Sequence, residues 1–252
     1  MAAPGLSVRP VEGLPEVTSG FGLGAAIAGL ADVTSGDVVA ISQKVVSKAE
    51  GRSVDLGSVE PGEKAEELAS RLGKDPRVVE LVLSEAVTVV RTDEDRGILI
   101  TETRHGFICA NSGIDASNVE GADTVLLLPE DSDASARRIR DEIEAAASVR
   151  PAVLISDSFG RAWRVGQSEV AIGCAGLTVI DDWRGRTDSH GRELAATMIA
   201  VADQVAAAAD LARDKTSRTP AVVVSGLSRY VTEEDGPGCR DQLRDPGEDL
   251  FR

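Results

Sequence analysis

The segment that organises this sequence is Pro151-Ala-Val-Leu-Ile-Ser-Asp-Ser-Phe-Gly-Arg-Ala-Trp-Arg-Val-Gly-Gln167. Its first residues are apolar and predict a buried strand that ends near Ile155. The residues after that point bring together a carboxylate, a hydroxyl and two guanidinium groups: Asp157, Ser158, Arg161 and Arg164. Polar groups of this kind at a strand end are typical of sites for a metal or an anion. We therefore expect such a site here, with a solvated surface turn as the alternative.

A second polar cluster follows another predicted strand, Phe107–Ala110. It reads Asn111-Ser-Gly-Ile-Asp-Ala-Ser-Asn118, in which Asp115 and Asn118 offer the oxygen atoms that a hard cation prefers. An ordinary Asn-Ser-Gly turn is the alternative. Because two strand ends carry an Asp in the same manner, we favour one shared metal site.

Two further segments are candidates for binding an anionic ligand. The apolar strand Asp37–Ser42 runs into a basic segment that carries Lys44, Lys48 and Arg52, and such cations suit phosphate. A solvated basic turn is the alternative. The N-terminal loop, residues 11–17, is made rigid by prolines and a glycine, and it either presents backbone N–H groups to a ligand or only connects two elements.

The composition narrows the class of protein. The formal net charge of −15 disfavours a nucleic-acid-binding protein, because phosphate contacts need clustered Lys and Arg. The 3 cysteines (Cys109, Cys174, Cys239) and 2 histidines (His105, His190) show no metal-binding spacing, and free thiols fit a reducing compartment. We see no signal peptide and no apolar run that could span a membrane, so we expect a cytoplasmic protein with neither nucleic acid nor membrane as partner. The residues alone predict a metal-assisted site for a small phosphorylated ligand.

The alternation of strand and helix patterns, taken alone, suggests a parallel α/β sheet. Helices are expected at 63–72 and, opened by Pro76, at 77–83. The longest helix is expected at 192–213, and the charged face of the helix at 134–147 is expected to be solvated. The polar, Gly/Pro-rich tail from Thr232 is either flexible or an ordered flap over the site.

Three segments in order resemble one known family. They are 37–52, 111–118 and 155–167, and they are similar to the coenzyme F420-0:gamma-glutamyl ligases, the CofE family, including the N-terminal ligase domain of actinobacterial FbiB. The resemblance covers nearly the whole chain, so we expect one ligase domain, 1–252, with two intertwined subdomains as a further option. It implies an α+β, CofE-like fold with a mixed or antiparallel sheet and flanking helices, and an intertwined homodimer. We follow the resemblance over the parallel α/β alternative.

The resemblance also implies an activity. The family members are GTP-dependent amide ligases that join L-glutamate to the deazaflavin coenzyme F420-0, and later glutamates by γ-linkage. An acyl phosphate intermediate is expected, with GDP and phosphate released and with Mg²⁺ or Mn²⁺ as cofactor, and K⁺ as an additional cation. Two alternatives stay open: a metal-dependent nucleotide phosphatase and a non-catalytic deazaflavin-binding module.

The family pattern can be carried over to single residues of this chain. Metal ligation is implied for Asp115, Asp157 and Ser158. Guanine-nucleotide contacts are implied for a second group: Leu14, Pro15, Glu16, Val17, Gln43, Lys48 and Asn118. Gln43 departs from the pattern, because the family commonly has a small hydroxyl residue there. Arg161 and Arg164 are candidates from their own chemistry only, for a phosphate or a substrate carboxylate, and no catalytic residue is assigned.

Overall fold

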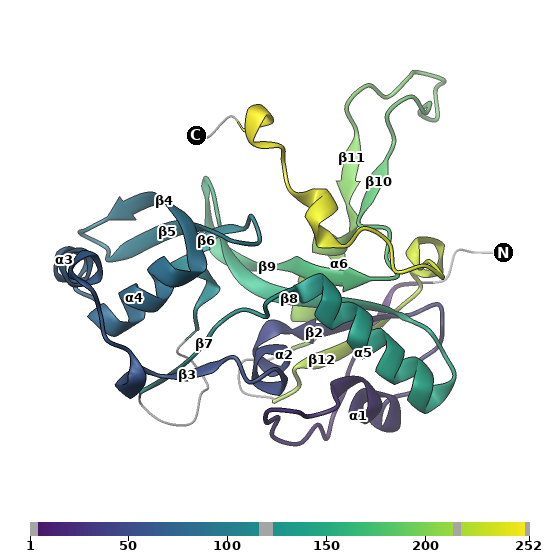
Figure 1. The fold of residues 1–252 in the computed structure, drawn as a ribbon. Coiled ribbons are helices and arrows are strands. Elements are labelled where there is room, and N and C mark those ends of the chain that lie inside the picture. The colour runs from purple at the N-terminus through teal and green to yellow at the C-terminus, as the bar shows by residue number, and fades with distance from the viewer. Residues whose placement is uncertain (1–4, 116–122, 214–217, 250–252) are drawn as a thin grey trace.

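The computed structural model describes residues 5–115, 123–213 and 218–249, and the predicted nucleotide contact Asn118 lies outside them. The larger lobe is built on a five-stranded sheet in the order β1-β12-β2-β8-β9 (Figure 1). The bounds of these strands are β1 Ser7–Pro10, β12 Ala221–Ser225, β2 Val38–Ser42, β8 Ala152–Arg161 and β9 Arg164–Ala175. Only β2 and β8 pair in parallel, and the other three pairs are antiparallel. The mixed sheet implied by the resemblance is confirmed, and the parallel α/β alternative was wrong.

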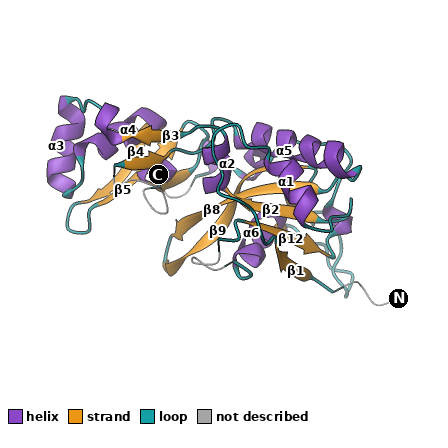
Figure 2. Ribbon diagram, turned by 90° about the horizontal axis from the view of Figure 1, so that it is seen from below, coloured by secondary structure: helices purple, strands orange, loops and turns teal. Residues whose placement is uncertain are grey.

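Helices cover both faces of this sheet (Figure 2). The helices α1 (Leu23–Leu30) and α5 (Ser132–Ala147) pack on one face, and α6 (Val201–Asp210) packs on the other. Strand β2 shows why, because its side chains alternate between the two faces and its first four residues are all buried. Val39 contributes to the core under α1 and α5, and Val38 contributes to the core under α6.

The smaller lobe is inserted between β3 (Ser53–Asp55) and β7 (Thr124–Leu126), which pair with each other in antiparallel fashion. It has a three-stranded sheet and two helices with a separate apolar core, and it lies at the left of Figure 1. Its elements are α3 (Glu63–Leu72), α4 (Pro76–Glu85), β4 (Ala86–Asp93), β5 (Ile98–Thr103) and β6 (Ile108–Ala110).

Local signals set the helix boundaries of this lobe. Helix α3 has the predicted bounds and ends at Gly73, whose positive φ of 62° is a common helix stop. Helix α4 begins with a proline at its first position, as predicted, and the side chain of Asp75 caps it by accepting from the N–H of Arg77.

The prediction that strand β8 ends near Ile155 was wrong. β8 continues to Arg161 and pairs with β9 from Val153 onward, so the polar residues belong to a long hairpin that turns at Ala162 and Trp163. The sequence does not indicate this part of the strand, because polar side chains lie on both faces of the hairpin and the usual alternation of apolar and polar residues is missing.

The long helix predicted at 192–213 was also wrong. Its first part forms β11 (Met198–Ala200), which pairs with β10 (Ile180–Asp182) at the base of an arm that projects from the body (Figure 1). Within 192–213 the α-helix is limited to α6, because residues 191–198 offer no buried apolar side chain around which a helix could pack. No helix in the three described ranges is both long enough and apolar enough to cross a bilayer.

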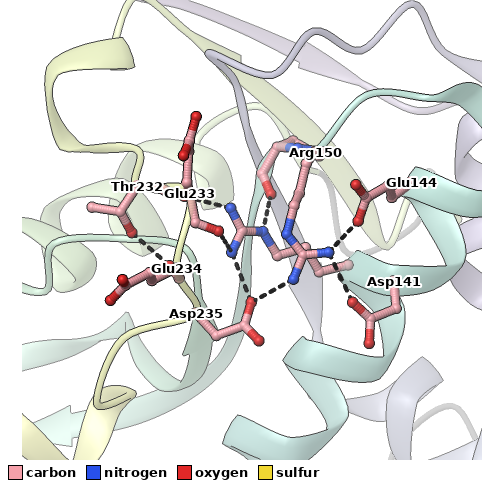
Figure 3. Close-up of polar contacts among 9 residues, drawn as sticks. Asp141, Glu144, Arg150, Thr232, Glu233, Glu234 and Asp235 are labelled. Carbon is pink, nitrogen blue, oxygen red and sulfur yellow. Dashed lines mark hydrogen bonds and ion pairs between the residues drawn. The ribbon is translucent and has the colours of Figure 1, made fainter.

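The charged face of α5 was expected to be solvated, and for Arg140 this was wrong. Arg140 is fully buried and binds a segment that we call the C-terminal strap, residues 231–243. Its guanidinium donates to the carbonyl oxygens of Thr232 and Glu233 and forms an ion pair of 2.7 Å with Asp235, in the region drawn in Figure 3. These residues therefore pack against the larger lobe, but none of the described tail residues lines the cavity described below, so a flap over the site is not supported.

Candidate functional site

A cavity of about 920 Å³ lies where the two lobes meet. Its walls come from the N-terminal loop, helix α2 (Gln43–Ala49), the turn Asn111–Gly113 after β6, the middle of the β8–β9 hairpin and the residues that precede β12. The cavity is therefore assembled from segments that are distant in sequence.

Most of the predicted site residues line this cavity. The structure brings together the metal candidates and most of the nucleotide candidates: Leu14, Pro15, Glu16, Val17, Lys48, Asp115, Asp157 and Ser158. Gln43 does not line it, because its side chain is fully buried and its Oε1 accepts from the Ser47 hydroxyl at 2.8 Å. Arg161 and Arg164 lie at the exposed end of the hairpin, where Arg161 donates to the carbonyl oxygen of Val165 at 2.7 Å.

Asp157 is the most strongly perturbed carboxylate of the cavity. Burial raises its pKa to about 7, and the negative charges of Glu169 and Asp115 add to the effect, while Lys44 opposes it. Asp115 itself forms an ion pair with Lys44, with 2.6 Å between Oδ2 and Nζ. A bound divalent cation would reduce the mutual repulsion of these carboxylates, so their oxygen atoms fit Mg²⁺ or Mn²⁺.

The two sides of the hairpin give this cavity two different polar walls. Asp157 and Ser158 are neighbours on one strand, so their side chains point to opposite faces of the hairpin. On the Ser158 face, its hydroxyl donates to Glu169, the residue directly opposite on β9. Glu169 in turn pairs with Arg213 at 3.2 Å, and Arg213 donates to the hydroxyl of Ser156 at 3.0 Å. A cation held by Asp157 is thus flanked by a second wall in which Glu169 is the central group.

The two lysines of the basic segment both reach the cavity and are both paired with carboxylates. Lys48 contacts Glu16 at 2.5 Å, and Lys44 contacts Asp115. A bound phosphate would compete with Glu16 for Lys48. Arg52, the third cation of that segment, is turned away and pairs with Glu85 at 3.2 Å, so its prediction as a phosphate contact finds no support in its position.

Sequence reasoning missed Glu169, Asp210 and Arg213, which all line the cavity. Glu169 carries no local signal, because only the register of the hairpin places it opposite Ser158. Arg213 was expected inside a long helix, whereas it follows the end of α6 and is free of helical constraints there. Cys109 also lines the cavity, but burial raises the pKa of its thiol to about 12, and the charge of Asp157 contributes, so the thiol stays protonated while it is buried there.

Comparisons with known proteins identify the family to which this chain is similar. A family model described as F420-0:gamma-glutamyl ligase matches residues 13–226. The chain is similar to the coenzyme F420:L-glutamate ligase of Methanopyrus kandleri, with 43% identity over 99% of this chain and 98% of the relative. It is 40% identical to the enzyme of that name from Methanothermobacter thermautotrophicus, over 98% and 99% of the two chains. A ligase of the same name from Halobacterium salinarum is 44% identical over 93% of this chain and 95% of the relative. With a match of this extent across both lobes and every wall of the cavity, the chain belongs to the F420-0:gamma-glutamyl ligase family.

Proposed function

We propose that this protein is a GTP-dependent ligase that adds L-glutamate to the deazaflavin coenzyme F420-0 and further glutamates by γ-linkage. Family membership supports the ligase activity, since the relatives carry the name of a coenzyme F420:L-glutamate ligase. The observation that carries the finer proposal is the cavity itself, which combines Asp115 and Asp157 with Lys44 and Lys48. Carboxylates for a divalent cation beside ammonium groups for phosphate are what a nucleotide triphosphate needs.

The chemistry follows from the weakness of a carboxylate as an electrophile. Transfer of the terminal phosphoryl group of GTP to the substrate carboxylate gives an acyl phosphate and releases GDP. The amine of glutamate then attacks the acyl carbon, the phosphate leaves, and the amine proton passes to a base or to water. A bound Mg²⁺ or Mn²⁺ supplies charge neutralisation to the phosphates. K⁺ is part of the same proposal through the family resemblance.

Individual residues take distinct roles in this proposal. Asp115 and Asp157 would hold the cation with their carboxylates, and Ser158, whose hydroxyl is directed to Glu169, would contribute a backbone oxygen. The loop Leu14–Val17 would contact the nucleotide. Lys48 would exchange its partner Glu16 for a phosphate oxygen. Glu169 fixes both the Ser158 hydroxyl and Arg213, so it sets the shape of the second wall.

We also propose a homodimer, which the exposed apolar side chains support. Trp163 and Val165 at the hairpin end are 82% and 94% exposed, and Val87 on β4 is 69% exposed. Large apolar side chains this exposed are typical of a surface that another chain covers. Light scattering on the purified protein tests this, and Val165→Glu should shift a dimer toward monomer.

The decisive test of the ligase is a mass spectrum of the coenzyme after incubation with the protein, GTP, Mg²⁺ or Mn²⁺ and glutamate. We expect a gain of glutamyl residues and release of GDP. Asp115→Asn and Asp157→Asn should abolish both, whereas Arg71→Ala, on helix α3 and outside the cavity, should leave them unchanged. GTP hydrolysis that ignores both glutamate and the deazaflavin would instead identify a nucleotide phosphatase. Deazaflavin binding that survives Asp115→Ala and Asp157→Ala, without any turnover, would identify a binding module.

A further inference from the structure

Three buried polar groups converge at a place outside the cavity. Asp133 in the first turn of α5, Cys174 on β9 and Cys239 at the start of the short turn η4 (Cys239–Gln242) come from distant segments, and their exposed fractions are 6%, 0% and 1%. The two sulfur atoms and a carboxylate oxygen lie within 4.8 Å of one another. None of the three residues lines the cavity, so the ligase chemistry leaves them without a role.

The carboxylate of Asp133 holds the backbones of both cysteines. Its Oδ1 accepts the N–H of Cys174 at 2.9 Å and the N–H of Cys239 at 2.8 Å. The two amide nitrogens therefore lie within about 6 Å of each other, which is compatible with the Cα separation of about 4.4–6.8 Å that a disulfide needs. Gly238 adopts a φ of 86°, and a Cβ there would lie 2.3 Å from the Asp133 carboxyl group, so only glycine permits this approach.

The arrangement suits a bond between the two sulfur atoms better than it suits a metal. Structural zinc sites use four ligands, and within the described residues this group offers three. One oxygen of Asp133 already accepts two amide hydrogens, which leaves only the other for a cation. The two sulfur atoms, in contrast, lie within 4.8 Å of each other in a buried site, so each thiol has the other as a close reaction partner.

We propose that Cys174 and Cys239 form a dithiol pair that a small-molecule disulfide oxidises to an intramolecular disulfide. One thiolate attacks the oxidant and expels a thiol, and the second cysteine then displaces the other thiol from the mixed disulfide. Two protein S–H bonds and the S–S bond of the oxidant are replaced by one protein S–S bond and two S–H bonds on the reduced oxidant. Because both sulfur atoms are buried, the reaction waits for a local opening of the C-terminal strap.

The consequence is a covalent connection between β9 and the C-terminal strap. In the reduced protein the strap is held by Asp133 and by the buried Arg140. Beyond Cys239 it reaches Leu243, whose side chain lies against Gly106 in the turn between β5 and β6 of the smaller lobe. Oxidation would therefore restrict a segment that leaves the larger lobe and contacts the smaller one.

Oxidation of the full-length, reduced protein with oxidised glutathione tests the proposal. Titration of thiols under denaturing conditions should fall from 3 per chain to one, and peptide mapping should identify a Cys174–Cys239 cross-link. Tryptic cleavage at Arg240 and Arg244 should slow by at least tenfold in the oxidised protein. Cys109→Ser is the matched control, since it removes a buried thiol elsewhere and should leave the cross-link intact.

Several outcomes would overturn the proposal. One is that all thiols stay free after prolonged oxidation under conditions in which a mild urea concentration opens the strap. Another is a cross-link that contains Cys109. A third is stoichiometric zinc in the purified protein that is lost in both Cys174→Ala and Cys239→Ala, because the thiols would then be metal ligands. Two variants are used so that poor folding of either one does not decide the result.

Discussion

Two polar clusters differ in whether their charged groups have hydrogen-bond partners and partners of opposite charge. The guanidinium of Arg140 is fully buried, yet it donates to the carbonyl oxygens of Pro151, Thr232 and Glu233 and pairs with Asp235. Asp235 is shared with Arg150 at 2.9 Å, a contact drawn in Figure 3. Around Asp157 the opposite holds, since burial raises its pKa to about 7 and the negative charges of Glu169 and Asp115 add to that effect.

The difference separates a group that serves the fold from a group that serves a ligand. A buried charge with a complete set of partners stabilises the arrangement in which it is found. A buried carboxylate beside other carboxylates destabilises the protein until a cation arrives, and perturbed groups of this kind gather at functional sites. The same contrast gives opposite signs for substitutions in the two clusters.

The largest effect is expected for Arg140→Met. The change leaves Asp235 and three carbonyl oxygens without the donor that they share, so the free energy of unfolding should fall by about 3–5 kcal/mol. Chemical denaturation in urea measures it. Arg138→Met on the same helix is the control, because Arg138 is partly exposed and pairs with Glu142 and Glu50, and its loss should cost about 1 kcal/mol or less. Equal losses in the two variants would contradict the assignment of Arg140 to the fold.

The opposite sign is expected for Asp157→Asn in metal-free protein. At pH 8 the wild-type carboxylate is charged and buried among other negative groups, whereas the amide is neutral. The free energy of unfolding should therefore rise, on the order of 2 kcal/mol. The same variant should lose Mn²⁺ binding in a titration followed by electron paramagnetic resonance. A variant that is destabilised, or that binds Mn²⁺ as the wild type does, would place Asp157 outside the metal site.

A smaller effect should appear in the pH dependence of stability. The pKa of Asp157 rises on folding from 3.8 to about 7, so the folded protein holds a proton that the unfolded chain releases. Its contribution to stability is present below about pH 4 and is lost as the pH rises toward 7. Metal-free wild type should show this decline, and Asp157→Asn should lack it. Denaturation curves at several pH values between 4 and 8 measure the difference, and parallel profiles would argue against a raised pKa.

The sequence allowed the site to be predicted better than the path of the chain that forms it. Asp115, Asp157 and Lys48 were predicted because each follows a recognisable strand within a family pattern, and all line one cavity. Glu169 was not found, because its proximity to Ser158 depends on the pairing of two strands and not on any local signal.

The same limit applies to the fold. Helix α3 was predicted with its bounds, because a helical pattern and a terminal glycine are local features. The antiparallel neighbour of β2 could not be predicted from alternating strands and helices, since β12 comes from the far end of the chain. Arg140 was misjudged for a similar reason, because only the returning strap makes its position a buried one.

The smallest effect is expected for Arg71→Ala, which tests whether burial sets these magnitudes. Arg71 donates two hydrogen bonds to Glu94, at 2.9 and 2.6 Å, so, like Arg140, it is a guanidinium group hydrogen-bonded to a carboxylate. Both side chains are about half exposed, however, and water replaces the lost contact at little cost. The urea midpoint of Arg71→Ala should match that of the wild type within error, with Ser70→Ala as a control for helix propensity. If Arg71→Ala were as damaging as Arg140→Met, the burial of Arg140 would not explain its importance.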